Sequence, residues 1–145
     1  MAEVAKIDID GVQWELKDQV ARNRIATLEE NAIAQDLEDI NITMNNGYTS
    51  NMATLRSHYK IGKIHFAIMQ INDINGTDIG TSATANIGHI NIRPKKTTSC
   101  ILNDYRHNVV IRASIANDGT ITMDESVGLI QGDNICLGEL IFAEE

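Results

Sequence analysis

The sequence predicts a mainly β protein with an N-terminal helix: a β-hairpin, a coiled-coil helix, and then an antiparallel β-sandwich of jelly-roll type. Three observations support this order. In residues 4–16, apolar and polar residues alternate on both sides of an Asp-Gly pair. Residues 18–44 lack glycine and proline, and apolar residues after Gly47 recur at every second position. The chain therefore divides into a hairpin (1–17), a coiled-coil stalk (18–46) and a β-sandwich head (47–145).

The hairpin is the clearest local signal. Asp10-Gly11 suits a two-residue turn with positive φ angles. Pairing across that turn brings together the apolar residues Ile7, Ile9, Val12 and Trp14, with Ile9 opposite Val12. A lone two-stranded hairpin is marginally stable in water. It must therefore pack on something, either its own helix or a larger assembly, and the first seventeen residues are candidates for attachment.

The segment after Asp18 is rich in strong helix formers, and Asp18 can cap its start. Its apolar residues follow heptad spacing in two successive registers, Ala21, Ile25, Leu28 and Ala32, then Ile33, Leu37, Ile40 and Met44. We expect these residues to join copies of the chain, with a change of phase near residue 32. The spacing leaves the number of helices open. The alternative is a single amphipathic helix folded onto the β domain.

Strands are expected at 59–72, 85–93, 97–103, 108–116, 120–124 and 135–143, separated by polar loops. In the first of these, Ile64, Phe66 and Ile68 share one face and His65, Ala67, Met69 and Ile71 share the other. Both faces are largely apolar, which is typical of a central strand or of a strand at a subunit interface. Short strands with turns at this spacing favour an antiparallel sandwich.

Composition excludes several classes of function. The net charge is −8, with no basic stripe, which argues against nucleic-acid binding. No run of eighteen apolar residues exists, so we expect no membrane insertion. Cys100 and Cys136 fit no metal or redox spacing, and we expect buried free thiols.

No catalytic, metal or cofactor motif is present in the sequence. None of the four histidines forms a zinc-binding pair, although His65 and His89 lie in expected strands, where a metal on a symmetry axis is a minor alternative. The aspartates fall mostly at turns, where local hydrogen bonding favours them. We therefore expect no enzyme, no metal and no cofactor.

Two parts of the chain resemble phage proteins. The elements Asp10-Gly11, Trp14, Leu16, Asp18, Ala21 and Arg22 resemble the N-terminal segment of phage fibre and tail-associated proteins. Residues 47–145 resemble the β-sandwich heads of phage receptor-binding proteins through Lys60-Ile61-Gly62-Lys63-Ile64, the proline after 90–93, the segment 113–121 and Gly132-Asp133-Asn134. Together these segments cover most of the chain.

The resemblance implies a non-enzymatic bacteriophage virion protein, assembled in the bacterial host cytoplasm as a parallel homotrimer. Its N-terminus would bind capsid or tail proteins, and its head would contact a host surface glycan or protein. Loops carry binding function on a rigid scaffold, so Thr77, Asp78, Thr81 and Ser82 are candidate receptor contacts. The alternatives are a capsid or neck decoration protein without a ligand and a glycan-processing enzyme. Tail or head location and the host remain open.

Overall fold

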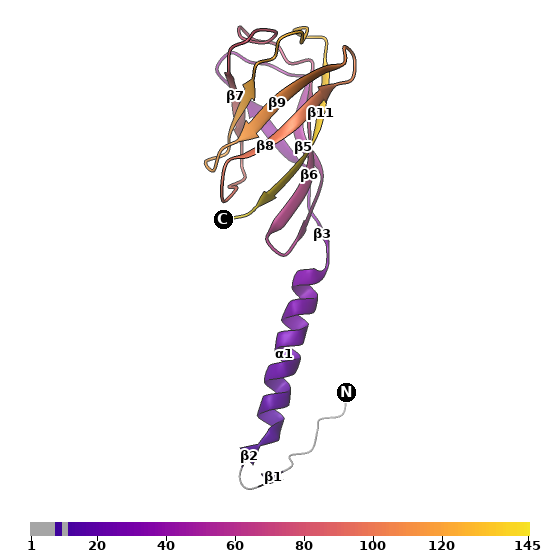
Figure 1. Ribbon diagram of the computed structural model, residues 1–145, viewed down its shortest axis with the longest axis vertical. Helices are drawn as coiled ribbons and strands as arrows, with labels where there is room; N and C mark the ends of the chain where they lie inside the picture. Colours follow the sequence, from indigo (N-terminus) through magenta and orange to yellow (C-terminus); the bar gives the residue numbers. More distant parts are fainter. Residues whose placement is uncertain (1–7, 10–11) are drawn as a thin grey trace. The chain divides into compact units, whose positions relative to one another are not determined.

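The structure, a computed structural model, describes residues 8–9 and 12–145 (Figure 1). It consists of two units, residues 1–34 and residues 35–145. The first contains β1 (Asp8–Ile9), β2 (Val12–Gln13) and α1 (Trp14–Ala32). The predicted pairing of Ile9 with Val12 is confirmed. Trp14 begins the helix instead of extending the second strand, and Ile7 and the Asp10-Gly11 turn lie outside the described residues.

The prediction of a coiled coil is wrong. The helix ends at Ala32, and the second heptad register instead spans β3 (Gln35–Asp36) and β4 (Ile40–Met44). Ile42 lies in the core of the second unit, and Ile40 and Met44 pack against it. The pattern Ile-Asn-Ile-Thr-Met also alternates with period two, and its branched side chains fit a strand better than a helix. Burial against the β domain decides between the two conformations.

The prediction of a jelly-roll sandwich is also wrong, because the second unit is a closed antiparallel barrel of eight strands. The strands pair in the ring order β4, β5, β6, β11, β8, β9, β10 and β7, and β7 pairs again with β4. The short β3 adds to β5 outside this ring. Alternating apolar residues are expected on the strands of a barrel and of a sandwich alike, so the sequence pattern could not show the closure.

The strands otherwise lie close to the predicted positions. Their bounds are β5 (Met52–Ile61), β6 (Ile64–Asn72), β7 (Ala85–Ile90), β8 (Thr98–Asp104), β9 (Val109–Ile115), β10 (Thr120–Asp124) and β11 (Ile135–Ala143). The predicted strand 59–72 is the end of β5 and all of β6, joined by a turn in which Gly62 has a φ of 59°. The two predicted faces of β6 are confirmed: His65 and Met69 point into the barrel and are buried, while Ile64 is exposed.

The barrel interior is a continuous apolar core. Leu55, Met69, Ile87 and Ile111, from four different strands, are all fully or almost fully buried. Because neighbouring strands are antiparallel, the segments 45–51, 73–84, 105–108 and 125–134 all lie at one end of the barrel. Residue 35, where this unit begins, and the C-terminus lie at the other end, as Figure 1 shows for the C-terminus. The barrel thus presents a group of loops at the end remote from its own first residue.

Candidate functional site

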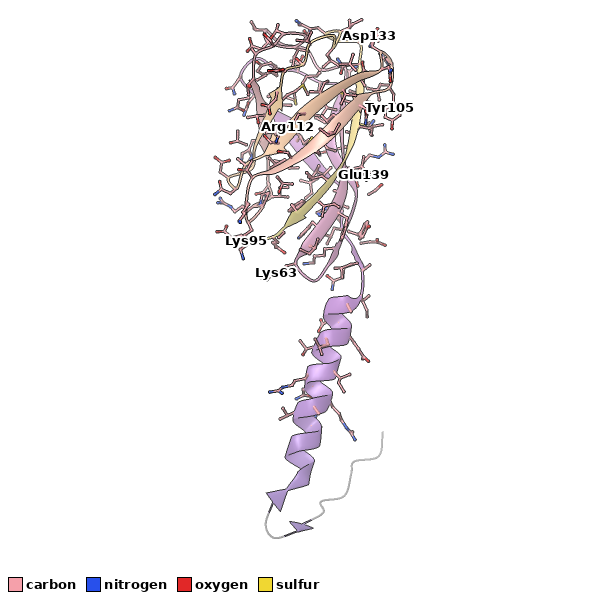
Figure 2. All side chains as sticks on the ribbon, in the orientation of Figure 1. Lys63, Lys95, Tyr105, Arg112, Asp133 and Glu139 are labelled. Carbon is pink, nitrogen blue, oxygen red and sulfur yellow. The ribbon has the colours of Figure 1, made fainter. Side chains whose placement is uncertain are left out.

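The candidate site is the loop end of the barrel, defined as residues 73–84, 105–108 and 125–134. Each segment connects two strands of the closed ring: β6 to β7, β8 to β9, and β10 to β11. Figure 2 shows Asp133 at this end and Lys63 and Lys95 at the opposite end. The sequence predicted three polar loops at these positions, and the antiparallel barrel brings them together.

A buried asparagine ties two of these loops to each other. The Asn134 side chain is fully buried and accepts the Ile74 N–H through Oδ1 at 3.1 Å. Its Nδ2 donates to the carbonyls of Ile74, at 3.2 Å, and Ile130, at 2.7 Å. The Gly132 N–H also donates to the Ile74 carbonyl at 2.9 Å. Because a buried amide needs its partners, these bonds fix loop 73–84 against loop 125–134.

Asp78 lies at the centre of a second set of contacts. The Tyr48 hydroxyl donates to Asp78 Oδ2 at 2.7 Å. Ser126 Oγ accepts the Gly80 N–H at 2.9 Å and donates to the Asp78 carbonyl at 3.3 Å. Burial and the bond to Asp78 raise the pKa of Tyr48 above its ordinary value. A Cβ at Gly76 would overlap the Tyr48 ring, so the ring can approach only because residue 76 is glycine.

Arg106 joins all three loops. Its Nη1 contacts Asp73 Oδ1 at 3.2 Å and also Asp133 Oδ1. Asp73 Oδ2 accepts the Asn51 side chain at 2.7 Å, so the fourth loop at this end is connected as well. An exposed ion pair contributes little stability alone, but one guanidinium shared by two carboxylates fixes geometry. The loop end is therefore cross-linked by polar contacts that no strand pairing supplies.

Asp104, the last residue of β8, holds loop 105–108 in place. Its side chain is almost completely buried and accepts the N–H groups of Ile135, at 2.9 Å, and Arg106, at 3.1 Å. His107 Nδ1 lies 2.9 Å from the same carboxylate. Burial alone would raise the pKa of Asp104, but these two N–H groups and His107 outweigh it and hold the pKa below its usual range. Asp104 therefore stays ionised and anchors loop 105–108.

The four residues predicted as receptor contacts lie together in loop 73–84. Thr77, Thr81 and Ser82 are exposed, whereas Asp78 is half-buried because it binds Tyr48. Thr81 Oγ1 donates to the Asp78 carbonyl at 2.8 Å. The sequence prediction missed Tyr48 and Arg106, which belong to other loops. The one sequence signal that could have indicated a role for Arg106 is that it is the single arginine in loops that contain no lysine.

The residues predicted to join copies are distributed over both units. On α1, Ile25 and Leu28 are 55 % and 68 % exposed, and Ala21 and Ala32 are exposed as well. Ile33, after the helix, is 63 % exposed. Leu37 is half-buried and, like Ile40 and Met44, lies outside the helix. Of the predicted attachment residues, Ile9, Val12 and Trp14 are placed by their backbone in β1, β2 and the start of α1.

A buried chain of two histidines lies at the barrel end opposite the loops. His58 Nε2 is 2.7 Å from His65 Nδ1, and His65 Nε2 is 3.2 Å from Glu144 Oε2. Because a carboxylate only accepts, His65 donates from Nε2 and accepts the His58 Nε2–H. His58 Nδ1 is then unprotonated, and it is buried without a hydrogen-bond partner. Over the described residues, no three His, Cys, Asp or Glu side chains form a group able to hold a metal ion.

A shallow groove of about 840 Å³ lies on the outside of the barrel where β8 and β11 diverge. Apolar side chains line it together with charged and aromatic ones, which include Arg56, Tyr105, Arg112 and Glu139. Figure 2 shows the last three on the outer surface of the barrel. Within the part of the chain that the structure describes, no helix is long and apolar enough to cross a membrane.

Similarity to known proteins is found among solved structures. No protein-family model matches the sequence. No curated protein matches it either. Among solved structures, the chain is similar to the receptor binding protein (gp15) of Listeria phage PSA, with 17% sequence identity and a TM-score of 0.48. The likeness covers 97% of this chain and 83% of that one.

Proposed function

We propose that this chain is a structural protein of a bacteriophage virion whose barrel adheres to the host surface through its loop end. The resemblance of the N-terminal motif around Trp14 and Arg22 to phage fibre proteins supports the virion part of the proposal. The observation that carries the adhesion part is the grouping of three polar loops at the barrel end remote from residue 35. A rigid scaffold with loops at one end is a common way to present a binding surface.

The chemistry of the loop end suits hydrogen bonding to sugars or to a polar protein surface. Thr77, Thr81 and Ser82 are exposed and offer hydroxyl groups, and Tyr105, which is 69 % exposed, offers an aromatic ring. The three loops contain no lysine and a single arginine, and the guanidinium of that Arg106 already binds two carboxylates. Like charges repel at an interface. The proposed receptor is therefore a neutral or cationic surface group, not a polyanion.

Adhesion without catalysis fits the state of three carboxylates at this end of the barrel, Asp73, Asp104 and Asp133. A general acid needs a raised pKa, whereas Asp104 is held ionised by backbone N–H groups and His107. Asp73 and Asp133 are both engaged by Arg106. The proposed mechanism is multivalent binding by a homotrimer, in which several weak contacts act together and raise the overall affinity. The exposed apolar residues Ile25 and Leu28 of α1 are a candidate contact between copies.

The direct test is competition for adsorption. Purified protein should block adsorption of the phage that carries it. A variant with Thr77, Thr81 and Ser82 changed to alanine should lose most of this blocking, and its circular dichroism spectrum should be unchanged. Asp78 is kept in this variant because its carboxylate accepts the Tyr48 hydroxyl. In a matched control variant, Thr43 and Thr120 are changed to alanine; both are polar residues on the outer barrel surface away from the loop end. This variant should block adsorption as well as the unmodified protein does.

Two results would overturn the proposal. Absence of blocking by folded, unmodified protein would favour a decoration protein without a ligand. Turnover of a glycan panel by the purified protein would favour the glycan-processing enzyme.

A further inference from the structure

The outer surface of the barrel is apolar on three adjacent strands. We call the outward side chains of β5, β6 and β11 that form it the apolar face; they are Tyr59, Ile61, Ile64, Phe66, Ile68 and Ile141. Ile141 is 58 % exposed, and Ile64 is 40 % exposed. The inner side of these strands already supplies the barrel core, so the fold of one chain does not require the apolar face.

Strand register makes these side chains one continuous surface. Tyr59 pairs with Phe66, and Phe66 pairs with Ile141, so these three residues form a row across all three strands. The Tyr59 and Phe66 rings stack with centroids 5.0 Å apart and planes 8° from parallel. Ile61 pairs with Ile64 in the next row. A contiguous apolar surface of this kind is a candidate interaction site.

The outward positions of β4, β7 and β10 are polar by contrast. Thr43, Asn86 and His89 are exposed there, and Thr122 is half-buried. The apolar face is therefore not a property of the whole barrel exterior, although β8 and β9 also carry the exposed Ile101 and Val110. Because the eight strands close into a ring, most of the outer surface of this barrel consists of strand faces and not of free strand edges.

Opposite charges flank the apolar face in the row beyond Phe66. Ile68 pairs with Arg56 on one side and with Glu139 on the other. Arg56 Nη1 donates to Gln70 Oε1, which holds the guanidinium on the outer surface. A rotation axis that runs along β6 would bring the β5 side of one copy against the β11 side of the next. Arg56 of each copy would then meet Glu139 of its neighbour.

We propose that the apolar face is the contact between copies of this chain, arranged about an axis along β6 with Arg56 paired to Glu139 across the interface. The occupant of the face is therefore a second copy of the chain. An axis along the strands also points the loop ends of all copies in one direction, which multivalent adhesion requires. This inference rests on the homotrimer in the proposed function but not on the identity of any receptor.

The test is cysteine cross-linking of the full-length chain. The double variant R56C/E139C should give covalent oligomers under mild oxidation, with three chains as the largest product, because each new thiol faces its counterpart in a neighbour. The native Cys100 and Cys136 are buried and should not contribute. The matched control is T43C/T120C, because Thr43 and Thr120 flank the exposed His89 in the same way that Arg56 and Glu139 flank Ile68.

Covalent oligomers from R56C/E139C and none from T43C/T120C would support the proposal. Equal yields from both pairs, or no covalent oligomer from the first pair, would overturn it. The adsorption assay separates this outcome from the proposed function. Blocking by a protein that does not cross-link would remove the interface and leave adhesion standing. Cross-linked trimers that fail to block adsorption would support the interface and remove the adhesion proposal.

Discussion

His58 is held neutral by its surroundings. Burial and the neighbouring His65 ring lower its pKa, and these effects outweigh the opposing influence of the Glu38 carbonyl and Asp39. The unfolded chain therefore binds a proton at a higher pH than the folded chain does. Stability from this group is present above the ordinary histidine pKa of 6.5 and is lost as the pH falls below it, through the lowered folded-state pKa.

Replacing His58 with phenylalanine should reduce the pH dependence of stability. The variant keeps a ring near Phe142 and His65 but carries no proton to bind. We expect its melting temperature to fall less than that of the unmodified protein between about pH 7.5 and about pH 5.5, measured by circular dichroism. Glu144 and Lys60 are the same in both proteins, whereas His65 loses the hydrogen bond from His58 Nε2. An identical fall in both proteins would contradict this assignment.

The two cysteines should be unreactive in the folded protein. Burial raises the pKa of Cys100 to about 11, and burial together with the charge of Asp104 raises the pKa of Cys136 to about 12. Both thiols are free, as the sequence predicted. Since the thiolate is the reactive form, a thiol reagent at about pH 8 should label neither residue until denaturant is added. Rapid labelling of native protein would show that the barrel opens locally at these strands.

Single residues were the hardest part of the site to predict. Spacing rules for metal and catalytic motifs treat His58 and His65 as unrelated, yet the hairpin between β5 and β6 places their rings in contact. Tyr48 and Asp78 likewise meet only because two loops fold to the same barrel end. Such contacts depend on strand register, which one sequence does not specify.

At the scale of elements, β8 crosses close to β11 at Gly138. A Cβ at this position would overlap the Ile101 carbonyl and approach the Leu102 side chain. Glycine is therefore needed for the contact where the two strands diverge.

Gly138→Ala should lower the free energy of unfolding by about 1–3 kcal/mol, the usual cost of forcing extra volume into a packed site. Urea titration measures this change. Gly132→Ala is the control for steric overlap, because open space surrounds that position; its cost arises only from its φ of 67° and should be smaller. A Gly138→Ala variant as stable as the unmodified protein would mean that β8 moves freely over β11.

The sequence located most strands but misjudged the boundary between helix and sheet. Residues 98–104 and 135–143 alternate clearly and lie where predicted, to within a residue. Residues 33–44 fit a heptad and a strand about equally well, and burial of Ile42 in the barrel decided the outcome. The first half of β5 was missed because its bulge near Ser57, which has a φ of 50°, interrupts the alternation.

At the scale of the whole molecule, the predicted division of roles between the N-terminus and the barrel leads to a deletion experiment. The buried core cluster lies within residues 42–142, so removal of residues 1–17 should leave the barrel folded. On the proposed function, the same deletion should abolish incorporation into particles. Circular dichroism of the purified variant and its amount in purified virions test the two halves separately. Normal incorporation would remove the attachment role of the N-terminus.

Closure of the barrel could not be predicted from the sequence, for a physical reason. Strand periodicity reports which side chains are buried, but the pairing of β7 with β4 is a long-range contact between strands that are far apart in sequence. The grouping of polar loops at one end follows from antiparallel pairing and could be predicted. The ties that hold these loops, through Arg106 and Asn134, could not.

A map of the intact particle tests the central claim most directly. If the chain is an adhesin, the loop end, with Thr77, Tyr105 and Asp133, should face solvent, and the first seventeen residues should contact capsid or tail. Neighbouring barrels should meet through β5, β6 and β11. A map in which the loop end is buried against the particle, with the N-terminus directed outward, would contradict the account.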